Sequence, residues 1–127
     1  MAEKNKYPLD YERRFGGVAK LYTKAGAERL KSAHVCVVGL GGVGSWAAEA
    51  LARTAVGRIT LVDLDNVAES NTNRQLQAMT GVYGNPKVDA TAERIHAINP
   101  LCDCRKIEDF IEVETAESLL PEDAIIL

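Results

Sequence analysis

A glycine-rich turn set between an apolar run and a helical pattern is the feature that most constrains the fold. Gly39-Leu-Gly-Gly-Val-Gly44 fits the pattern G-x-G-x-x-G, follows the apolar run 34–39 and opens the alanine-rich segment 43–55. A second apolar run, 58–63, ends in Asp63, 19 residues after Gly44. This order of strand, glycine turn, helix, strand and acidic residue is typical of a Rossmann-like nucleotide-binding unit.

The glycines of the turn, Gly39, Gly41, Gly42 and Gly44, are the residues we expect to bind a nucleotide. They let the backbone approach a phosphate, and the helix that follows offers free amide groups and the positive end of its dipole. Asp63 can accept hydrogen bonds from ribose hydroxyls. An NAD enzyme would use the same groups, and a tight turn without a ligand is the structural alternative.

The rest of the sequence alternates between helical and extended patterns. The segment from about Val18 to Ala33 has a helical pattern, and we interpret Gly16 and Gly17 as a turn before it. One face of this helix would carry Val18, Leu21, Tyr22, Ala25 and Leu30. The further predicted elements are a polar loop at 64–80, a helix at 86–98, a strand at 102–107, a helix at 115–120 and a strand at 123–127, and the first ten residues look mobile. The predicted class is therefore α/β, a Rossmann-like parallel sheet with helices on both faces and an N-terminal helix before it.

Length and composition are those of one globular domain spanning residues 1–127. The net charge of −3 gives no overall basic signature for nucleic acid, and no apolar run approaches the length of a membrane span. The three cysteines are an odd number and show no disulfide-scaffold pattern, and the N-terminus does not resemble a signal peptide. Both observations favour a cytoplasmic protein with reduced thiols. Because 123–127 reads as a buried strand with nothing after it, we expect an N-terminal fragment whose domain is truncated at its C-terminal end.

Charged residues after the second strand bear on which nucleotide binds. Asp63 and Asp65 would project to one side if the strand persisted, although Asp65 could equally cap a turn. Arg74 follows a run of amides and hydroxyls, and Lys87 lies at a helix N-terminus, where a cation opposes the dipole. An anion bound between them and the glycine turn would explain both cations, and a triphosphate needs more positive charge than a dinucleotide. The alternative is two solvated surface cations.

Four stretches together resemble the HesA/MoeB/ThiF family, whose members look like the activating enzymes of ubiquitin-like modifiers. They are Val37 to Gly44, Asp-Leu-Asp-Asn-Val at 63–67, Ser-Asn-Thr-Asn-Arg-Gln at 70–75 and Asn-Pro-Lys at 85–87. Within the family, the segments 14–17, 44–54 and 71–75 closely resemble the members that dehydrate threonylcarbamoyladenosine in tRNA. The resemblance covers roughly 13–127.

The resemblance implies an enzyme that uses ATP and Mg²⁺ to adenylate a carboxylate, here to cyclise threonylcarbamoyladenosine in tRNA. It implies that Asp63 binds the ribose and that Asn71, Arg74 and Lys87 contact the phosphates. It also implies tRNA as partner, a homodimer whose N-terminal helix reaches the neighbouring subunit, and a sulfur-transfer protein as a possible further partner.

Two departures from the family pattern stand out. Relatives that activate sulfur-carrier proteins offer a second Arg to the ATP of the neighbouring subunit; Gly17 occupies that position here, so Arg14 is the candidate replacement. The family's metal-binding Asp follows the fourth strand, beyond Leu127. We therefore assign no metal ligand and expect residues 1–127 alone to be inactive.

Three other functions stay open: adenylation of a ubiquitin-like sulfur-carrier protein, NAD-dependent oxidation, and non-catalytic nucleotide binding. Several residues are interpreted as structural, namely Cys36, Cys102 and Cys104 as core thiols, His34 as a strand end, His96 as helix surface and the acidic run 108–117 as solvated. Trp46 could stack on an adenine or pack between helix and sheet.

Overall fold

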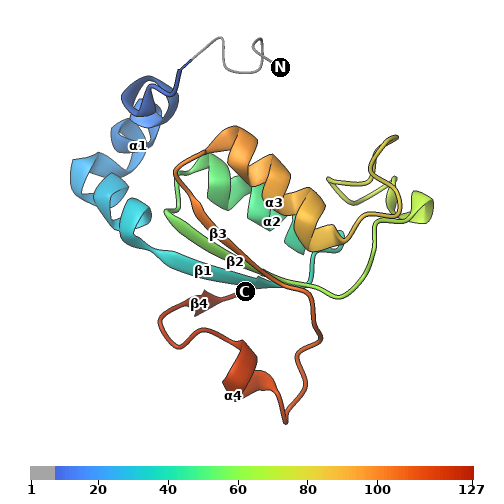
Figure 1. Cartoon of the computed structure of the whole chain (residues 1–127). Helices are drawn as coiled ribbons and strands as arrows, with labels where there is room; N and C mark the ends of the chain where they lie inside the picture. The colour runs from blue at the N-terminus through green and yellow to red at the C-terminus, as the bar shows by residue number, and fades with distance from the viewer. Residues whose placement is uncertain (1–7) are drawn as a thin grey trace.

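The fold is a four-stranded parallel sheet with its helices arranged around it, as a computed structural model of residues 8–127 shows (Figure 1). The elements are α1 (Tyr11–Ser32), β1 (His34–Val38), α2 (Gly44–Arg53), β2 (Arg58–Val62), the 3₁₀ turn η2 (Glu69–Asn71), α3 (Lys87–Ile98), β3 (Asp103–Ile107), α4 (Ala116–Leu119) and β4 (Ile125–Ile126). We expected the first ten residues to be mobile, and residues 1–7 of that segment lie outside the described residues.

The strands lie in the order β3-β2-β1-β4, and every pair is parallel. This is the order of the first four strands of a doubly wound dinucleotide-binding sheet. β1 and β2 pair along their whole length, from His34 opposite Arg58 to Val38 opposite Val62. The carboxyl ends of these two central strands therefore lie side by side, and the glycine turn and Asp63 follow them there. The predicted α/β class is confirmed.

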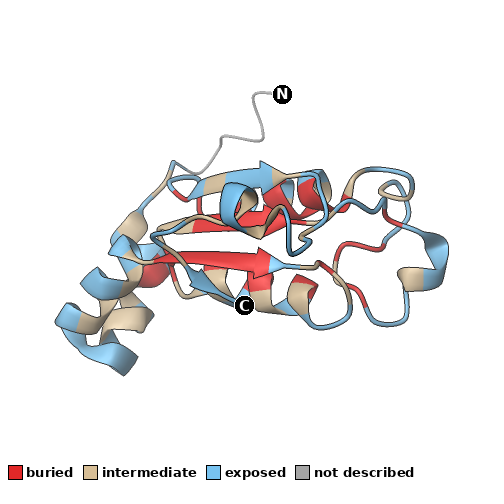
Figure 2. Ribbon diagram, turned by 90° about the horizontal axis from the view of Figure 1, so that it is seen from below, coloured by how far each residue is buried: buried red, intermediate tan, exposed pale blue. Residues whose placement is uncertain are grey.

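The main core lies between the sheet and the helices α2 and α3, which cover one face (Figure 1). Figure 2 shows the central strands as almost wholly buried. β1 and β2 read as continuous apolar runs because both of their faces are covered. Small residues on the helices, Ala48, Ala52 and Ala92, allow close approach to the sheet. The segment that carries α4 passes on the opposite face, so helices lie on both faces as predicted.

Helix α1 ends where the sequence predicted, but it differs from the prediction at its start and in its interior. It begins at Tyr11, where Asp10 caps it by accepting from the Arg13 amide at 3.1 Å, and it runs through Gly16 and Gly17 without a turn. Thr23 then interrupts the helix with φ = 69° and ψ = 168°. The kink means that the two halves do not share one continuous helical face.

The apolar face predicted for α1 is found only in part, because Leu30 packs against the core whereas three other members of that face are exposed. Leu21 is 74% exposed and Tyr22 49% exposed, and Ala25 is also exposed. The buried side chain of the helix is Phe15, which packs against Tyr11 with ring centroids 5.0 Å apart. The prediction assumed an unbroken helical period through Thr23. The kink there separates residues that this period had placed on one face.

His34 is buried and has two polar partners that the sequence did not reveal. Its Nδ1–H donates to Asp123 Oδ1 at 3.1 Å, and its Nε2 accepts from the Thr60 hydroxyl at 2.7 Å. Arg58 also donates to Asp123, at 3.0 Å. Desolvation acts to raise the pKa of Asp123, but the hydrogen bond from His34 and the charge of Arg58 outweigh it and the pKa is lowered. This cluster links Asp123, which precedes β4, to residues at the start of β1 and β2.

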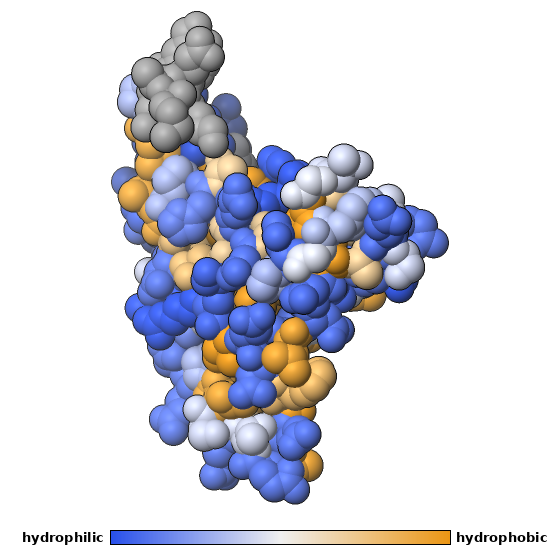
Figure 3. All heavy atoms as spheres, turned by 45° about the vertical axis from the view of Figure 1, so that its right-hand side comes forward, coloured by the Kyte–Doolittle hydropathy of each residue, from blue (hydrophilic) through white to orange (hydrophobic). Residues whose placement is uncertain are grey.

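β4 forms one edge of the sheet and is shorter than predicted, although Leu127 still exchanges backbone hydrogen bonds with β1. Exposed apolar side chains gather around β4 and α4, in the lower part of Figure 3. They include Phe110, Val113, Ile125, Ile126 and Leu127. Within residues 8–127, no helix has the length and apolar character needed to cross a membrane.

Candidate functional site

The glycine turn is built by close contacts that only glycine permits. Gly39 has φ = 91°, a left-handed conformation, and its amide donates to Val62 O at 2.8 Å. A Cβ on Gly44 would lie 1.7 Å from Gly39 O, so the start of α2 rests directly on the turn. No side chain caps the first amides of α2. The turn therefore presents the N-terminus of α2 as an anion-binding site.

Asp63 ties the glycine turn to the loop after β2. Its Oδ2 accepts from the Leu40 amide at 2.7 Å and its Oδ1 accepts from the Asp65 amide at 2.8 Å. Each carboxylate oxygen has a second lone pair, so these bonds leave Asp63 able to accept from a ribose hydroxyl. Its role toward ribose stays a prediction, but its position beside the turn is what that role needs.

Asp65 points elsewhere, toward Lys87. β2 ends at Val62, so strand alternation does not continue through Asp63 and Asp65. The Lys87 amide donates to Asp65 O at 3.0 Å, and the Lys87 Nζ lies 3.9 Å from Asp65 Oδ2. Lys87 is only 6% exposed, whereas the Asp65 side chain is 67% exposed. Lys87 is thus a buried cation whose carboxylate partner is distant and solvated.

Arg74 lies across the glycine turn. A Cβ on Gly42 would be 3.4 Å from Arg74 Cγ, and the Arg74 guanidinium donates to Ser70 O at 3.0 Å and to Asn73 Oδ1 at 2.9 Å. Asn71 closes the turn η2 by accepting from the Ala68 amide at 3.0 Å. The structure thus brings Arg74 to the turn, while the bond that it shows for Asn71 is local.

Three hydrogen bonds dock residues 74–77 onto the glycine turn and the start of α2. Trp46 Nε1 donates to Arg74 O at 2.9 Å, and the Leu76 amide donates to Ser45 Oγ at 3.3 Å. Gln77 Nε2 donates to Leu40 O at 2.9 Å. For Trp46, which the sequence placed beside an adenine or in packing, the contact found is with the Arg74 backbone.

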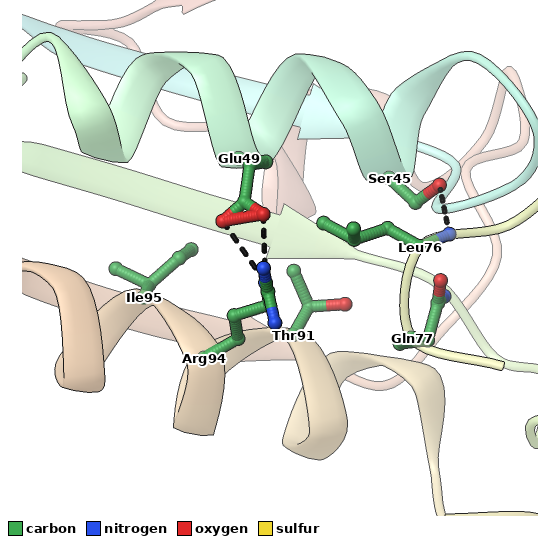
Figure 4. Close-up of a pocket in the computed structure, with 7 residues that line it drawn as sticks. All are labelled: Ser45, Glu49, Leu76, Gln77, Thr91, Arg94 and Ile95. Carbon is green, nitrogen blue, oxygen red and sulfur yellow. Dashed lines mark hydrogen bonds and ion pairs between the residues drawn. The ribbon is translucent and has the colours of Figure 1, made fainter. Parts of the chain in front are cut away.

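A small pocket lies beside this segment, between α2 and α3 (Figure 4). Its volume is about 10 Å³, which is room for about one water, and it is lined by Ser45, Glu49, Leu76, Gln77, Thr91, Arg94 and Ile95. Glu49, 9% exposed, accepts two bonds from Arg94 Nε, at 2.9 and 2.7 Å. This pocket is too small for a nucleotide, and the candidate site rests on the geometry of the glycine turn itself.

Comparison with known proteins agrees with this geometry. The model of the ThiF family matches residues 11–127, almost the whole chain. The chain belongs to the ThiF family. The predicted family is confirmed, and the glycine turn, Asp63, Arg74 and Lys87 all lie within the matched residues.

The relatives in this family are of two kinds. The tRNA threonylcarbamoyladenosine dehydratase of Haemophilus influenzae is 49% identical over 87% of this chain, and that of Escherichia coli is 52% identical over 80%. The molybdopterin-synthase adenylyltransferase of Salmonella typhimurium is 36% identical over 80%. The chain spans 42%, 38% and 41% of these three proteins, less than half of each.

A solved structure supports the nucleotide prediction. The E. coli tRNA N6-threonylcarbamoyladenosine dehydratase, TcdA, in complex with ATP superposes with a TM-score of 0.84 at 48% identity. The match covers 86% of this chain and 45% of TcdA. That relative binds ATP, in agreement with the prediction of ATP over NAD for this ThiF-family chain.

Arg14 does not join the site of its own chain. Its Nη1 donates to Ile98 O at 3.2 Å, at the carboxyl end of α3, whereas Lys87 begins that helix. The eleven-residue separation along α3 corresponds to roughly 16 Å at 1.5 Å per residue. A role for Arg14 at an ATP therefore requires the site of a neighbouring ThiF-family subunit, and it stays a prediction.

The cysteines of this ThiF-family chain are free thiols in the structure. Desolvation raises the pKa of Cys102 to about 11 and that of Cys104 to about 12, so both stay protonated at neutral pH. No group of three or more His, Cys, Asp or Glu side chains among residues 8–127 could hold a metal ion. Cys36 and Cys102 are buried, and His96 is exposed on α3, in agreement with their predicted structural places.

Proposed function

We propose that this chain is the nucleotide-binding part of an enzyme that adenylates a carboxylate with ATP. The observation that carries the proposal is an uncapped helix N-terminus with Arg74 beside its glycine turn and with the buried Lys87 linked to that turn through the loop after β2. Arg74 lies over Gly42, and Lys87 is joined to the turn through Asp65 and Asp63. These groups would neutralise a triphosphate and stabilise the charge that develops at the α-phosphorus.

The carboxylate that we propose is that of the threonylcarbamoyl group on an adenosine of tRNA. It attacks the α-phosphorus of ATP, and pyrophosphate leaves. A nitrogen of the same threonylcarbamoyl group then attacks the activated acyl carbon, AMP leaves, and a ring closes with net loss of one water. Support comes from the identity of 49–52% to dehydratases of this nucleoside, against 36% to the molybdopterin-synthase enzyme.

In this proposal the residues hold ATP in distinct ways. The amides at Gly41 and Gly42 and the start of α2 face the phosphates, Asp63 accepts from the ribose, and Arg74 and Lys87 supply positive charge. Asn71 would donate its amide hydrogens to a phosphate oxygen. Mg²⁺ enters with the phosphates and keeps mainly phosphate and water ligands, and Asp65 is the exposed carboxylate nearest to Lys87.

The partners and setting follow from the same proposal. The substrate is a tRNA, and the enzyme is a cytoplasmic homodimer in which Arg14 of one subunit serves the site of the other. A sulfur-transfer protein is a further partner within this proposal. Because the overall charge is −3, this proposal needs local basic surface for the phosphate contacts with tRNA.

The test measures the tRNA product directly, on the protein in its complete form. The protein is incubated with ATP, Mg²⁺ and tRNA that carries threonylcarbamoyladenosine, and the nucleosides are then weighed after digestion. The expected product is lighter by one water, forms only with ATP, and is lost in Arg74→Ala. Unchanged nucleosides, from a preparation shown to bind ATP, would overturn the tRNA substrate.

Activation of a sulfur-carrier protein is the second candidate, because the sulfur carrier protein adenylyltransferase of Thermus thermophilus is 38% identical over 80% of this chain. Such an enzyme would adenylate the C-terminal carboxylate of a ubiquitin-like protein. Mass spectrometry of that carrier, after incubation with ATP, separates the two functions: a gain of one AMP would select this candidate.

A further inference from the structure

The half-exposed Trp46 side chain makes a hydrogen bond to the backbone of Arg74. It lies in the first turn of α2, two residues after Gly44, and it is 52% exposed. Its indole Nε1 nevertheless donates to Arg74 O at 2.9 Å, across 28 residues of sequence. Because half of the ring is exposed, packing alone does not fix its orientation, and the hydrogen bond to Arg74 O is its directed contact.

The position of the Arg74 side chain depends on its own loop. The guanidinium binds Ser70 O and Asn73 Oδ1, both within four residues of Arg74. These bonds orient the guanidinium relative to the loop, but they do not fix the loop relative to the glycine turn. The Trp46 bond does so at the Arg74 peptide itself. Two further bonds hold the residues that follow, from the Leu76 amide to Ser45 Oγ and from Gln77 Nε2 to Leu40 O of the glycine turn.

We propose that Trp46 is a positioning residue for Arg74: its indole N–H sets the distance between the Arg74 guanidinium and the phosphates. The inference rests on the proposed function and deepens it. Trp46 acts through Arg74 and does not touch the nucleotide. A preorganised cation stabilises a transition state only when it is already in place, and small displacements of such groups cost large factors in rate.

The decisive variant is Trp46→Phe, which keeps an aromatic ring and removes the N–H. In the complete protein with saturating tRNA substrate, we expect kcat for pyrophosphate release to fall about fivefold, as for loss of one neutral hydrogen bond. We expect KM for ATP to change little, because the Arg74 charge acts mainly in the transition state, and the thermal midpoint to fall by only a few degrees, because the variant loses one exposed hydrogen bond of the fold. An effect on stability and KM without one on kcat would show a merely structural role.

The control is Tyr83→Phe, which removes a bond from the same loop. The Tyr83 hydroxyl lies 2.7 Å from Thr72 Oγ1 and reaches neither α2 nor the glycine turn. We expect this variant to keep the wild-type kcat. An equal loss of kcat in both variants would mean that general loosening of the loop, and not the Trp46 bond, is responsible.

A double-mutant cycle separates the inference from the function on which it rests. If Trp46 acts through Arg74, Trp46→Phe should have no further effect in an Arg74→Ala background. Additive losses would overturn the positioning role while leaving the proposed function intact. A wild-type rate in Arg74→Ala alone would instead overturn the assignment of Arg74, and with it the proposed mechanism.

Discussion

Lys87 occupies a position that is unfavourable for a cation in the protein alone. It begins α3, where the helix dipole is positive, and its side chain is 6% exposed. Burial of an ammonium group costs free energy unless it is well paired, and the carboxylate of Asp65 is 3.9 Å away and mostly solvated. A residue kept at a cost in stability is expected where function needs it, and a bound phosphate would supply the missing counter-charge.

We therefore predict opposite effects of Lys87→Met on rate and on stability. The variant keeps the buried chain length and removes the charge, so the thermal midpoint should stay the same or rise. Adenylate formation should slow by about 10²-fold, the usual loss when a preorganised charge contact is removed. Arg74→Ala should slow it by a similar factor with the fold intact.

Stopped-flow measurement of pyrophosphate release checks both variants. Lys20→Met is the matched control, because Lys20 is an exposed lysine on α1. It should leave the rate unchanged. Near-normal turnover in both Lys87→Met and Arg74→Ala would show that neither cation acts on the nucleotide.

Two glycines of the chain should respond in opposite directions to the same substitution. Gly44→Ala would place a Cβ 1.7 Å from the backbone oxygen of Gly39, so we expect a loss of about 3 kcal/mol in the free energy of unfolding. Gly17 is exposed within α1, and a Cβ there meets nothing within 4 Å. Gly17→Ala should therefore gain about 0.5–1 kcal/mol. Urea denaturation of both variants measures the difference, and a stable Gly44→Ala protein would contradict the close contact.

Among the elements, those that bury both faces were predicted well from sequence. Burial restricts which residues can occur at a position. The sequence therefore indicates β1 and β2 by their apolar runs and α2 by its small residues. α1 was predicted poorly, since nothing in its sequence marks the kink at Thr23 or shows that the glycine pair continues a helix. Local patterns do not report contacts between distant residues, such as that between His34 and Asp123, 89 residues apart.

Helices α2 and α3 are joined by an ion pair that the sequence did not indicate. Glu49 lies on the buried side of α2 and binds Arg94 of α3 at 2.7 Å (Figure 4). Glu49→Ala leaves Arg94 without this partner, and we expect a loss of about 1.5–3 kcal/mol in the free energy of unfolding, the usual range for hydrogen bonds to charged groups.

Thermal and urea denaturation check this pair. Glu93→Ala is the control, because Glu93 is exposed on the same helix, α3, and it should change stability by less than about 0.5 kcal/mol. Similar losses in the two variants would mean that helix α3, rather than the ion pair, is sensitive to substitution.

At the scale of the molecule, the candidate site lies at one end of the sheet and Arg14 at the other. The glycine turn and Asp63 follow the carboxyl ends of β1 and β2, and Arg14 bonds to the last turn of α3. The sequence located the glycine turn because its spacing is local, but it gave no distance between Arg14 and that turn. Within one chain, the Arg14 side chain satisfies a free helix carbonyl, which is a structural role.

The proposed homodimer predicts that two strongly impaired variants restore each other. If Arg14 acts only at the neighbouring site, Arg14→Ala and Arg74→Ala each lose most of their activity, yet a mixed dimer holds one complete site. After dissociation and random reassembly of equal amounts, about a quarter of the sites should be active, because half of the dimers are mixed and each has one intact site. The rate of dehydrated-nucleoside formation in the mixture measures that fraction. Full activity of Arg14→Ala alone, with a lowered thermal midpoint, would show instead that Arg14 only caps α3.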